Sequence, residues 1–278
     1  MLLGARLLCA QANPAQPRKF AIERAALQQY EDGPALAANY EFLPGETVVV
    51  GCRLTGYATE KKGSEQRVNL AWQLRVLDPS GVPVDKEHSG RIDDTVLPED
   101  KNWMPKLQVS FTLPPFAPSG SYRIPVTVTD EAGHAEASTE LKFQVRGHSV
   151  DPSDTLVVRN FQFLRSENDQ VPMRSPVYHP GDMLWARFDI TGYKFGPNNS
   201  FSIEYGLAIL NAAGEQLFAQ PMAASDTNES FYPQRYAPGT LSLHLDQSVA
   251  KASYTLVVTV RDTVGDQTFE SRQAFQVE

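Results

Sequence analysis

Five histidines are the residues best suited to acid–base or metal chemistry, and their spacing argues against both. They are scattered along the chain as His88, His134, His148, His179 and His244. No two of them stand two, three or four residues apart, the separations that place two metal ligands on one face of a strand or helix. A meeting of His179 and His244 in space stays open as an alternative. We otherwise expect ordinary loop histidines and no metal centre.

Carboxylates and hydroxyls offer two further routes to chemistry. Asp130, Asp151, Asp154 and Asp262 carry the hard oxygen ligands that Ca²⁺ prefers, and they leave a calcium site near the middle of the chain as an alternative. No dense Asp-x-Asp-x-Asp run supports that site, so we expect no cofactor. The serines, including Ser119 and its neighbours, lack the Gly-x-Ser-x-Gly elbow of a nucleophile. The sequence therefore predicts a protein without enzymatic activity.

The two cysteines, Cys9 and Cys52, predict a buried thiol and no disulfide. Cys9 lies in the apolar start of the chain, and its loss with a cleaved leader leaves Cys52 alone. Cys52 aligns with Phe188 in the repeat described below, on the inward face of a strand. A reactive thiol needs exposure and a basic neighbour, so Cys52 is predicted to be a small core residue.

Aromatic residues are the strongest candidates for contacts with a partner. They lie in loops or on the outward face of a strand, and aromatic side chains on a rigid scaffold suit protein or glycan recognition. The alternative is that they pack between two domains, or between a loop and a sheet. The candidates are Trp185, Tyr193, Phe195, Phe231, Tyr232 and Tyr236.

A repeated pattern supplies the elements that must position these residues. Residues 42–57 align without a gap to residues 178–193, with Pro-Gly-acid near the start and Thr-Gly-Tyr at the end of each. Residues 122–145 align to residues 254–277, and 9 of the 24 positions are identical. Self-similarity at this spacing predicts two copies of one domain.

Each copy predicts short strands separated by turns. Apolar residues alternate at Val48, Val50, Cys52 and Leu54, which is typical of a half-buried strand. Matching alternation recurs through both copies, and no stretch predicts a helix of convincing length. Residues 85–105 read as a long polar connection. Pro125 stands inside a strand that should be central, so the local pairing of that strand is in question.

The residues at the turns and on the core strands resemble those of a known class of domain. Trp72 on a core strand, Gly120-Ser121-Tyr122 before an alternating strand and the Pro-Gly-Glu opening resemble tandem bacterial immunoglobulin-like repeats of the fibronectin-type or macroglobulin-like kind. The resemblance implies an all-β fold of two tandem immunoglobulin-like antiparallel β-sandwiches, over residues 20–147 and 154–278. It also implies that Tyr122 and Tyr254 send their hydroxyls to backbone groups a few residues upstream.

Composition and charge narrow the class of function. The 278 residues carry a formal charge of −8, and neither half is basic, which argues against nucleic acid as a partner. No run approaches the ~18 apolar residues of a transmembrane helix. The apolar residues 1–12 end in Ala10-Gln11-Ala12 and resemble a secretory signal peptide, so we expect export to the periplasm or the extracellular space.

The sequence thus predicts a non-enzymatic, exported binding or scaffolding protein whose partner is a protein or an envelope glycan. Two alternatives stay open. One is a carbohydrate-binding module that uses Trp185 or the loop at residues 231–236. The other is an accessory module of an envelope hydrolase, with its site in the groove between the domains. The sequence sets no oligomeric state.

Overall fold

The computed structural model describes residues 19–97, 99–100 and 102–278. Strands β1 to β17 dominate it, and the only helix in this part of the chain is the 3-10 turn Pro197–Asn199. The predicted all-β class is confirmed. No helix among the described residues is long and apolar enough to cross a membrane. The predicted signal peptide, residues 1–12, lies outside the described residues.

The N-terminal half contains two facing sheets. The smaller sheet has the order β1-β3-β7, formed by β1 (Ala21–Gln28), β3 (Thr47–Thr55) and β7 (Lys106–Thr112). The larger has the order β2-β9-β8-β5-β4, formed by β2 (Glu41–Phe42), β9 (Ala135–Val145), β8 (Gly120–Asp130), β5 (Glu65–Leu74) and β4 (Glu60–Lys62). One further strand, β6 (His88–Val96), pairs with β5. Because Leu70–Leu74 pairs with both β8 and β6, β6 forms the outer edge beyond β5.

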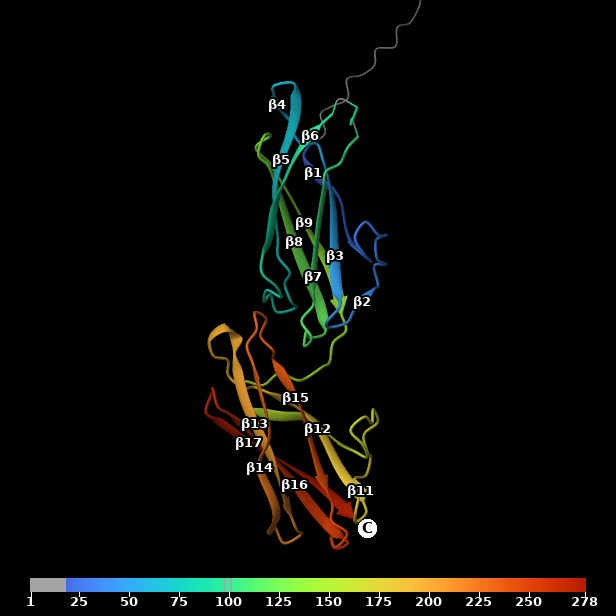
Figure 1. Ribbon diagram of the computed structural model, residues 1–278, viewed down its shortest axis with the longest axis vertical. Coiled ribbons are helices and arrows are strands. Elements are labelled where there is room, and N and C mark those ends of the chain that lie inside the picture. Colours follow the sequence, from blue (N-terminus) through green and yellow to red (C-terminus); the bar gives the residue numbers. More distant parts are fainter. Residues whose placement is uncertain (1–18, 98, 101) are drawn as a thin grey trace, which may run out of the picture.

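The C-terminal half repeats this strand order. Its smaller sheet is β10-β12-β15, formed by β10 (Val157–Leu164), β12 (Met183–Thr191) and β15 (Tyr236–His244). Its larger sheet is β11-β17-β16-β13-β14, formed by β11 (Val177–Tyr178), β17 (Gln267–Val277), β16 (Ala252–Asp262), β13 (Phe201–Leu210) and β14 (Gln216–Asn228). The two halves lie end to end (Figure 1). That each half is a separate, repeated domain stays a prediction.

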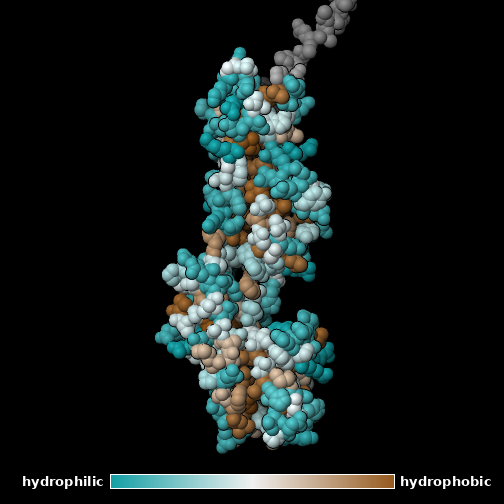
Figure 2. Space-filling view, in the orientation of Figure 1, coloured by the Kyte–Doolittle hydropathy of each residue, from teal (hydrophilic) through white to brown (hydrophobic). Residues whose placement is uncertain are grey.

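Alternating apolar residues bury themselves between the sheets of each half. Val48, Val50, Cys52 and Leu54 on β3 are all buried, as the period of two predicted. Two separate clusters of buried side chains result, one in each half. Hydrophilic residues cover most of the visible face, with hydrophobic patches in both halves (Figure 2). The N-terminal cluster includes one residue from the other half, Tyr232.

Two edge strands depart from the sequence prediction. The polar connection predicted over residues 85–105 is wrong for His88–Val96, which forms β6. The strand β14 was not predicted either. An edge strand keeps much of its surface in water, so its apolar residues need not alternate, and the period of two fades where only one neighbour is present.

Pro125 is accommodated without a break in register. Leu74 pairs with Val126 on one side of it and Leu77 with Arg123 on the other, which is the same alignment of β5 and β8. Arg75 still donates its N–H to the Pro125 carbonyl at 3.3 Å. The proline therefore removes one donor from the ladder and leaves the strand in place.

The reactivity of Cys52 gives a direct test of the register of β3. Cys52 is 1% exposed, and burial raises the pKa of its thiol from 9.0 to about 11. The native protein is expected to resist Ellman's reagent at pH 8 and to react once denatured. Folding favours the protonated thiol, so this group should cost stability only as the pH rises above 9.0. Rapid labelling of native protein would contradict the register, because a shift by one residue reverses every side chain.

Candidate functional site at the contact between the halves

Asp78 is a fully buried carboxylate in the turn that follows β5. It is 0% exposed. Its Oδ1 accepts the backbone N–H groups of Ser80 and Val82, both at 2.8 Å, in the manner of an aspartate that organises its own turn. The backbone closes the same turn, because Gly81 donates its N–H to the Asp78 carbonyl at 2.9 Å. One carboxylate oxygen therefore serves the turn, and the other faces the C-terminal half.

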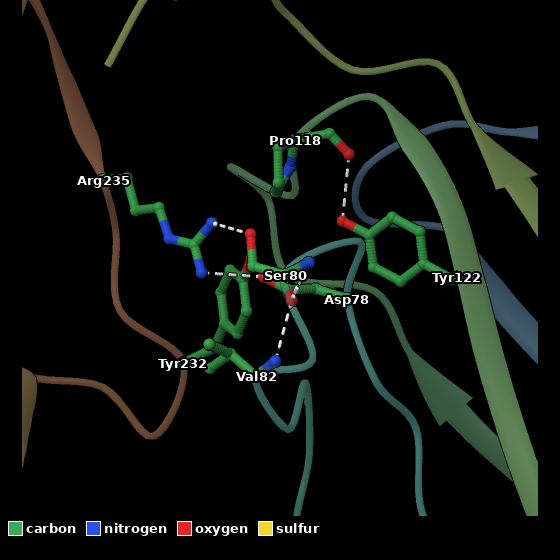
Figure 3. Close-up of polar contacts among 7 residues, drawn as sticks. All are labelled: Asp78, Ser80, Val82, Pro118, Tyr122, Tyr232 and Arg235. Carbon is green, nitrogen blue, oxygen red and sulfur yellow. Dashed lines mark hydrogen bonds and ion pairs between the residues drawn. The ribbon is translucent and has the colours of Figure 1, made fainter. Parts of the chain in front are cut away.

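Two side chains of the C-terminal half reach Asp78 Oδ2 (Figure 3). The Tyr232 hydroxyl donates to it at 2.9 Å, and Arg235 Nη2 donates at 2.8 Å. Arg235 Nη1 also donates to Ser80 Oγ at 3.3 Å, and its guanidinium carbon lies 5.9 Å from the centre of the Tyr232 ring. Four donors, one of them charged, thus offset the cost of burying the carboxylate. We call Asp78, Tyr232 and Arg235 the Asp78 cluster.

Tyr122 lies beside the Asp78 cluster. Its hydroxyl donates to the Pro118 carbonyl at 2.9 Å (Figure 3), and Tyr254 makes the matching bond to the Ala250 carbonyl at 2.7 Å. The predicted role of both tyrosine hydroxyls is confirmed. Burial raises the pKa of Tyr122 and of Tyr232, and the charge of Asp78 adds to the rise in both. Both phenols therefore stay protonated and can donate.

A second contact joins the segment between β9 and β10, residues 146–156, to the C-terminal half; we call it the connecting segment. His148 Nε2 lies 2.7 Å from Asp189 Oδ2, and Asn160 Nδ2 donates to the same oxygen at 2.7 Å. Asp189 is buried. The Tyr236 ring lies 5.3 Å from the His148 ring and 5.5 Å from the Phe116 ring of the N-terminal half. Side chains from both halves and from the segment between them therefore pack together.

Two of the six predicted contact aromatics are buried. The expectation that Tyr193 faces outward is wrong: it packs on Phe201, and its hydroxyl donates to the Gln234 carbonyl. The strand ends at Thr191, and the positive φ of Gly192, 80°, turns the chain, so alternation does not carry on to Tyr193. Tyr232 is also buried, in the N-terminal core.

The other four predicted aromatics keep some surface. Trp185 and Tyr236 are half-buried, whereas Phe195 and Phe231 are 38% and 51% exposed. Packing between the halves, stated above as the alternative, describes Tyr236 and the buried Tyr232. A role in partner binding stays a prediction for the exposed pair.

Sequence reasoning missed Asp78 and Arg235, although the repeat held a signal. Asn211 stands where Asp78 stands, and its Oδ1 accepts the N–H groups of Ala213 and Glu215 at 3.0 and 2.9 Å. An uncharged amide therefore organises this turn as well as a carboxylate does. The charge at position 78 exceeds what the turn needs, which indicates a cationic partner elsewhere in the chain.

Of the four aspartates considered for calcium, two accept backbone hydrogen bonds and two are exposed. Asp130 accepts the N–H groups of Ala58 and Gly133 at 2.7 and 3.0 Å, and Asp262 holds the matching turn in the other half. Asp151 and Asp154 are exposed on the connecting segment. Within the described ranges, no three His, Cys, Asp or Glu side chains are grouped to hold a metal ion. The calcium alternative gains no support from this geometry.

Described residues line a cavity in the N-terminal half and another at its border with the C-terminal half. One, of about 240 Å³, opens at the contact between the halves, and its lining residues are Val84, Pro114, Pro115, Phe116, Asn228, Ser230, Tyr232 and Gln234. The other, of about 440 Å³, includes Tyr57, Asp100, Asn102 and Trp103 in its lining. Burial raises the pKa of Tyr57, and the nearby charge of Asp100 adds to the rise. The first is mainly apolar, while the second combines aromatic and polar groups.

Comparison with known proteins gives a distant likeness and no family. No family model matches the chain, and no curated protein matches it. The C-terminal domain of the AgI/II polypeptide BspA of Streptococcus agalactiae is similar at 9% identity, over 93% of this chain and 99% of that one, with a TM-score of 0.30. The C-terminal domain of the antigen I/II-family protein AspA of Streptococcus pyogenes is similar at 8% identity, over 95% and 100%, with a TM-score of 0.32.

A glycoside hydrolase is also similar over part of the chain. It is a family 123 enzyme from Clostridium perfringens, described in connection with glycolipid glycan hydrolysis, at 12% identity and a TM-score of 0.31. The match covers 45% of this chain and 27% of the hydrolase, so this chain spans only a small part of that enzyme. Likeness at these scores carries no argument about function.

Proposed function

We propose that the chain is a non-enzymatic, exported scaffolding or binding protein, in which two β-sandwich domains, residues 20–147 and 154–278, keep one end-to-end arrangement. The Asp78 cluster is the observation that carries this proposal. Separating the halves breaks the hydrogen bonds from Tyr232 and Arg235 to Asp78, and the bond from Arg235 is charge-assisted, so the contact favours the closed arrangement. Two domains on a loose tether need no such contact.

A fixed arrangement suits a spacer that presents binding surfaces at set positions. The partner in this proposal is a protein or an envelope glycan, and no nucleic acid is expected. The proposed export to the periplasm or the extracellular space rests on the leader-like residues 1–12. The buried free thiol of Cys52 is compatible with that location.

Small-angle X-ray scattering of the full chain tests the fixed arrangement. The wild-type protein is expected to scatter as one elongated rigid particle whose curve fits the end-to-end structure. Arg235→Met is expected to broaden the distribution of particle sizes, whereas the same change at Arg261, an exposed arginine, is expected to leave it unchanged. A wild-type curve that requires many relative orientations of the halves would refute the proposal.

Carbohydrate binding is the second candidate function. The cavity of about 440 Å³ places Trp103 and Tyr57 beside Asp100 and Asn102, and aromatic faces with adjacent polar groups suit a sugar. Titration with mixed polysaccharides should then change tryptophan fluorescence. The change is expected to vanish in Trp103→Phe and to persist in Trp185→Phe. A response that depends on Trp185 instead would move the site to β12, and no response in the wild type would remove this candidate.

A further inference from the structure

The strand β14 is an open edge of the larger sheet in the C-terminal half. It is the longest strand in the described part of the chain, with 13 residues, and β13 is its one partner strand there. It stands at the end of the strand order β11-β17-β16-β13-β14. Alternate backbone N–H and C=O groups of an edge strand point away from its partner, and an added strand can pair with them.

The matching edge of the N-terminal half is protected, and β14 is not. On β6, Arg91 pairs with Glu131, and Asp93 lies 3.4 Å from Arg67. Charges on an edge are a common means of preventing unwanted strand pairing. From Gln216 to Ser225, β14 has no charged residue. The two halves share their strand order, so β6 and β14 are equivalent edges. Only β6 carries the charges that prevent strand pairing.

Large apolar side chains lie in water along β14. Leu217, Phe218 and Met222 are 58%, 43% and 60% exposed. Phe218 pairs with Ile209, which is buried, and directly paired residues have their side chains on the same face of a sheet. Phe218 therefore points to the side of the opposing sheet. That sheet ends at β15, and it covers Phe218 only in part, because Phe218 is 43% exposed.

Two irregularities limit how far a strand could pair with this edge. The register of β13 and β14 shifts between Tyr205 and Leu207 and again between Ile209 and Leu210. Pro221 lies within the first irregularity and has no N–H to donate. A Cβ on Gly206, which faces this bulge, would lie 2.2 Å from the Pro221 carbonyl oxygen, so the bulge is built into the packing. An added strand would therefore be short, and open-ended stacking of chains is disfavoured.

The negative charge around β14 indicates which kind of segment could pair with it. Residues 211–230 contain Glu215, Asp226 and Glu229 and no Lys, Arg or His. Residues 148–278 hold 9 Lys and Arg against 15 Asp and Glu, a net charge of −6. Antiparallel pairing of two copies centred on Met222 would place Glu215 opposite Glu229 at both ends. A second copy is therefore disfavoured, and a segment with basic ends is favoured.

We propose that β14 is a docking edge that accepts a short extended segment of another protein, apolar and alternating in its middle and basic at its ends. The segment would continue the sheet through backbone hydrogen bonds and place its apolar side chains over Phe218 and its neighbours. This rests on the proposed scaffolding function and names the kind of partner. The spacing of the halves is independent of it, because the Asp78 cluster lies outside β14.

Selection from a display library of random 12-residue peptides on the full chain tests the proposal. The enriched peptides are expected to alternate apolar and polar residues between Lys or Arg ends. Their affinity is expected to fall at least tenfold for the double variant Leu217→Lys, Met222→Lys, which gives β14 the charged character of β6. Both side chains are more than half exposed, so the variant should fold, and far-UV circular dichroism checks this. The matched control is Thr95→Lys on β6, which should bind as the wild type does.

Three outcomes would overturn the proposal. Enriched peptides without the alternating basic-ended pattern are one, and equal binding by the double variant is another. The third is a concentration-dependent dimer of the wild type, seen in sedimentation and lost in the double variant, which would assign the edge to a second copy. The scattering experiment stands apart: a rigid particle with no peptide binding would leave the scaffold proposal intact and remove this one.

Discussion

Replacement of Arg235 by methionine is expected to lower the free energy of unfolding by about 3–5 kcal/mol, because it strands a buried charge. Asp78 has no exposed surface, and its other donors are two backbone N–H groups and the Tyr232 hydroxyl. These neutral groups orient toward the carboxylate without balancing its charge. Urea unfolding of the full chain, followed by tryptophan fluorescence, measures the loss.

Asp78→Asn provides the decisive control for this prediction. Asparagine keeps the oxygen that accepts from Ser80 and Val82, as Asn211 does in the other half. The single variant Asp78→Asn should lower the free energy of unfolding by about 1–3 kcal/mol, because a charge-assisted hydrogen bond is lost. In the Arg235→Met background it should instead restore stability, because the uncompensated charge is gone. Asparagine that destabilises equally in both backgrounds would show that Asp78 and Arg235 are not coupled.

The cores of the two halves could be predicted from the sequence because their signals are local. Val48, Val50 and Cys52 alternate in the sequence, and the pleat of a strand converts that alternation directly into burial. The hydroxyls of Tyr122 and Tyr254, whose role the resemblance to immunoglobulin-like domains implied, bond only four residues upstream. Neither inference required knowledge of which strands are neighbours.

The candidate site could not be predicted in this way because its partners are distant in the sequence. Asp78 and Arg235 are 157 residues apart, and no local period relates them. The nearest signal is a comparison of repeats, in which an aspartate stands where an asparagine suffices. The alternation rule also fails where a glycine with positive φ redirects the chain, as Gly192 does before Tyr193. Contacts between charges far apart in the sequence, and single backbone turns, are therefore what the sequence pattern could not predict.

Edge strands form a third class that the pattern misses. β6 and β14 each have one full-length partner, so burial constrains their side chains weakly. Their sequences do show whether an open edge carries charged or apolar side chains. Arg91 and Asp93 close one edge with charge, while Leu217 and Met222 leave the other apolar. Comparison of two equivalent edges thus carries information that neither strand shows alone.

Replacement of Tyr122 by alanine is expected to cost about 3–5 kcal/mol, because it empties a ring-sized volume of the N-terminal core. The side chain is 0% exposed, and its ring lies 5.3 Å from that of Phe143. Tyr254 packs in the matching way on Phe275, at 5.6 Å, so Tyr254→Ala should cost a similar amount in the C-terminal half. Losses of this size approach the total stability of a small domain. Urea melts of the full-length variants would then show one half unfolding before the other.

Phenylalanine at the same two positions separates the ring from the hydroxyl. Each change keeps the packing and removes one hydrogen bond, to Pro118 or to Ala250, at an expected cost of about 0.5–1.5 kcal/mol. The cost at Tyr122 should be the larger of the two, because Tyr122 is fully buried beside the Asp78 cluster while Tyr254 is 7% exposed. Water can reach the acceptor more easily at the second site. Neutral substitutions at both positions would show that these hydroxyls are satisfied by solvent and that the rings alone stabilise the two cores.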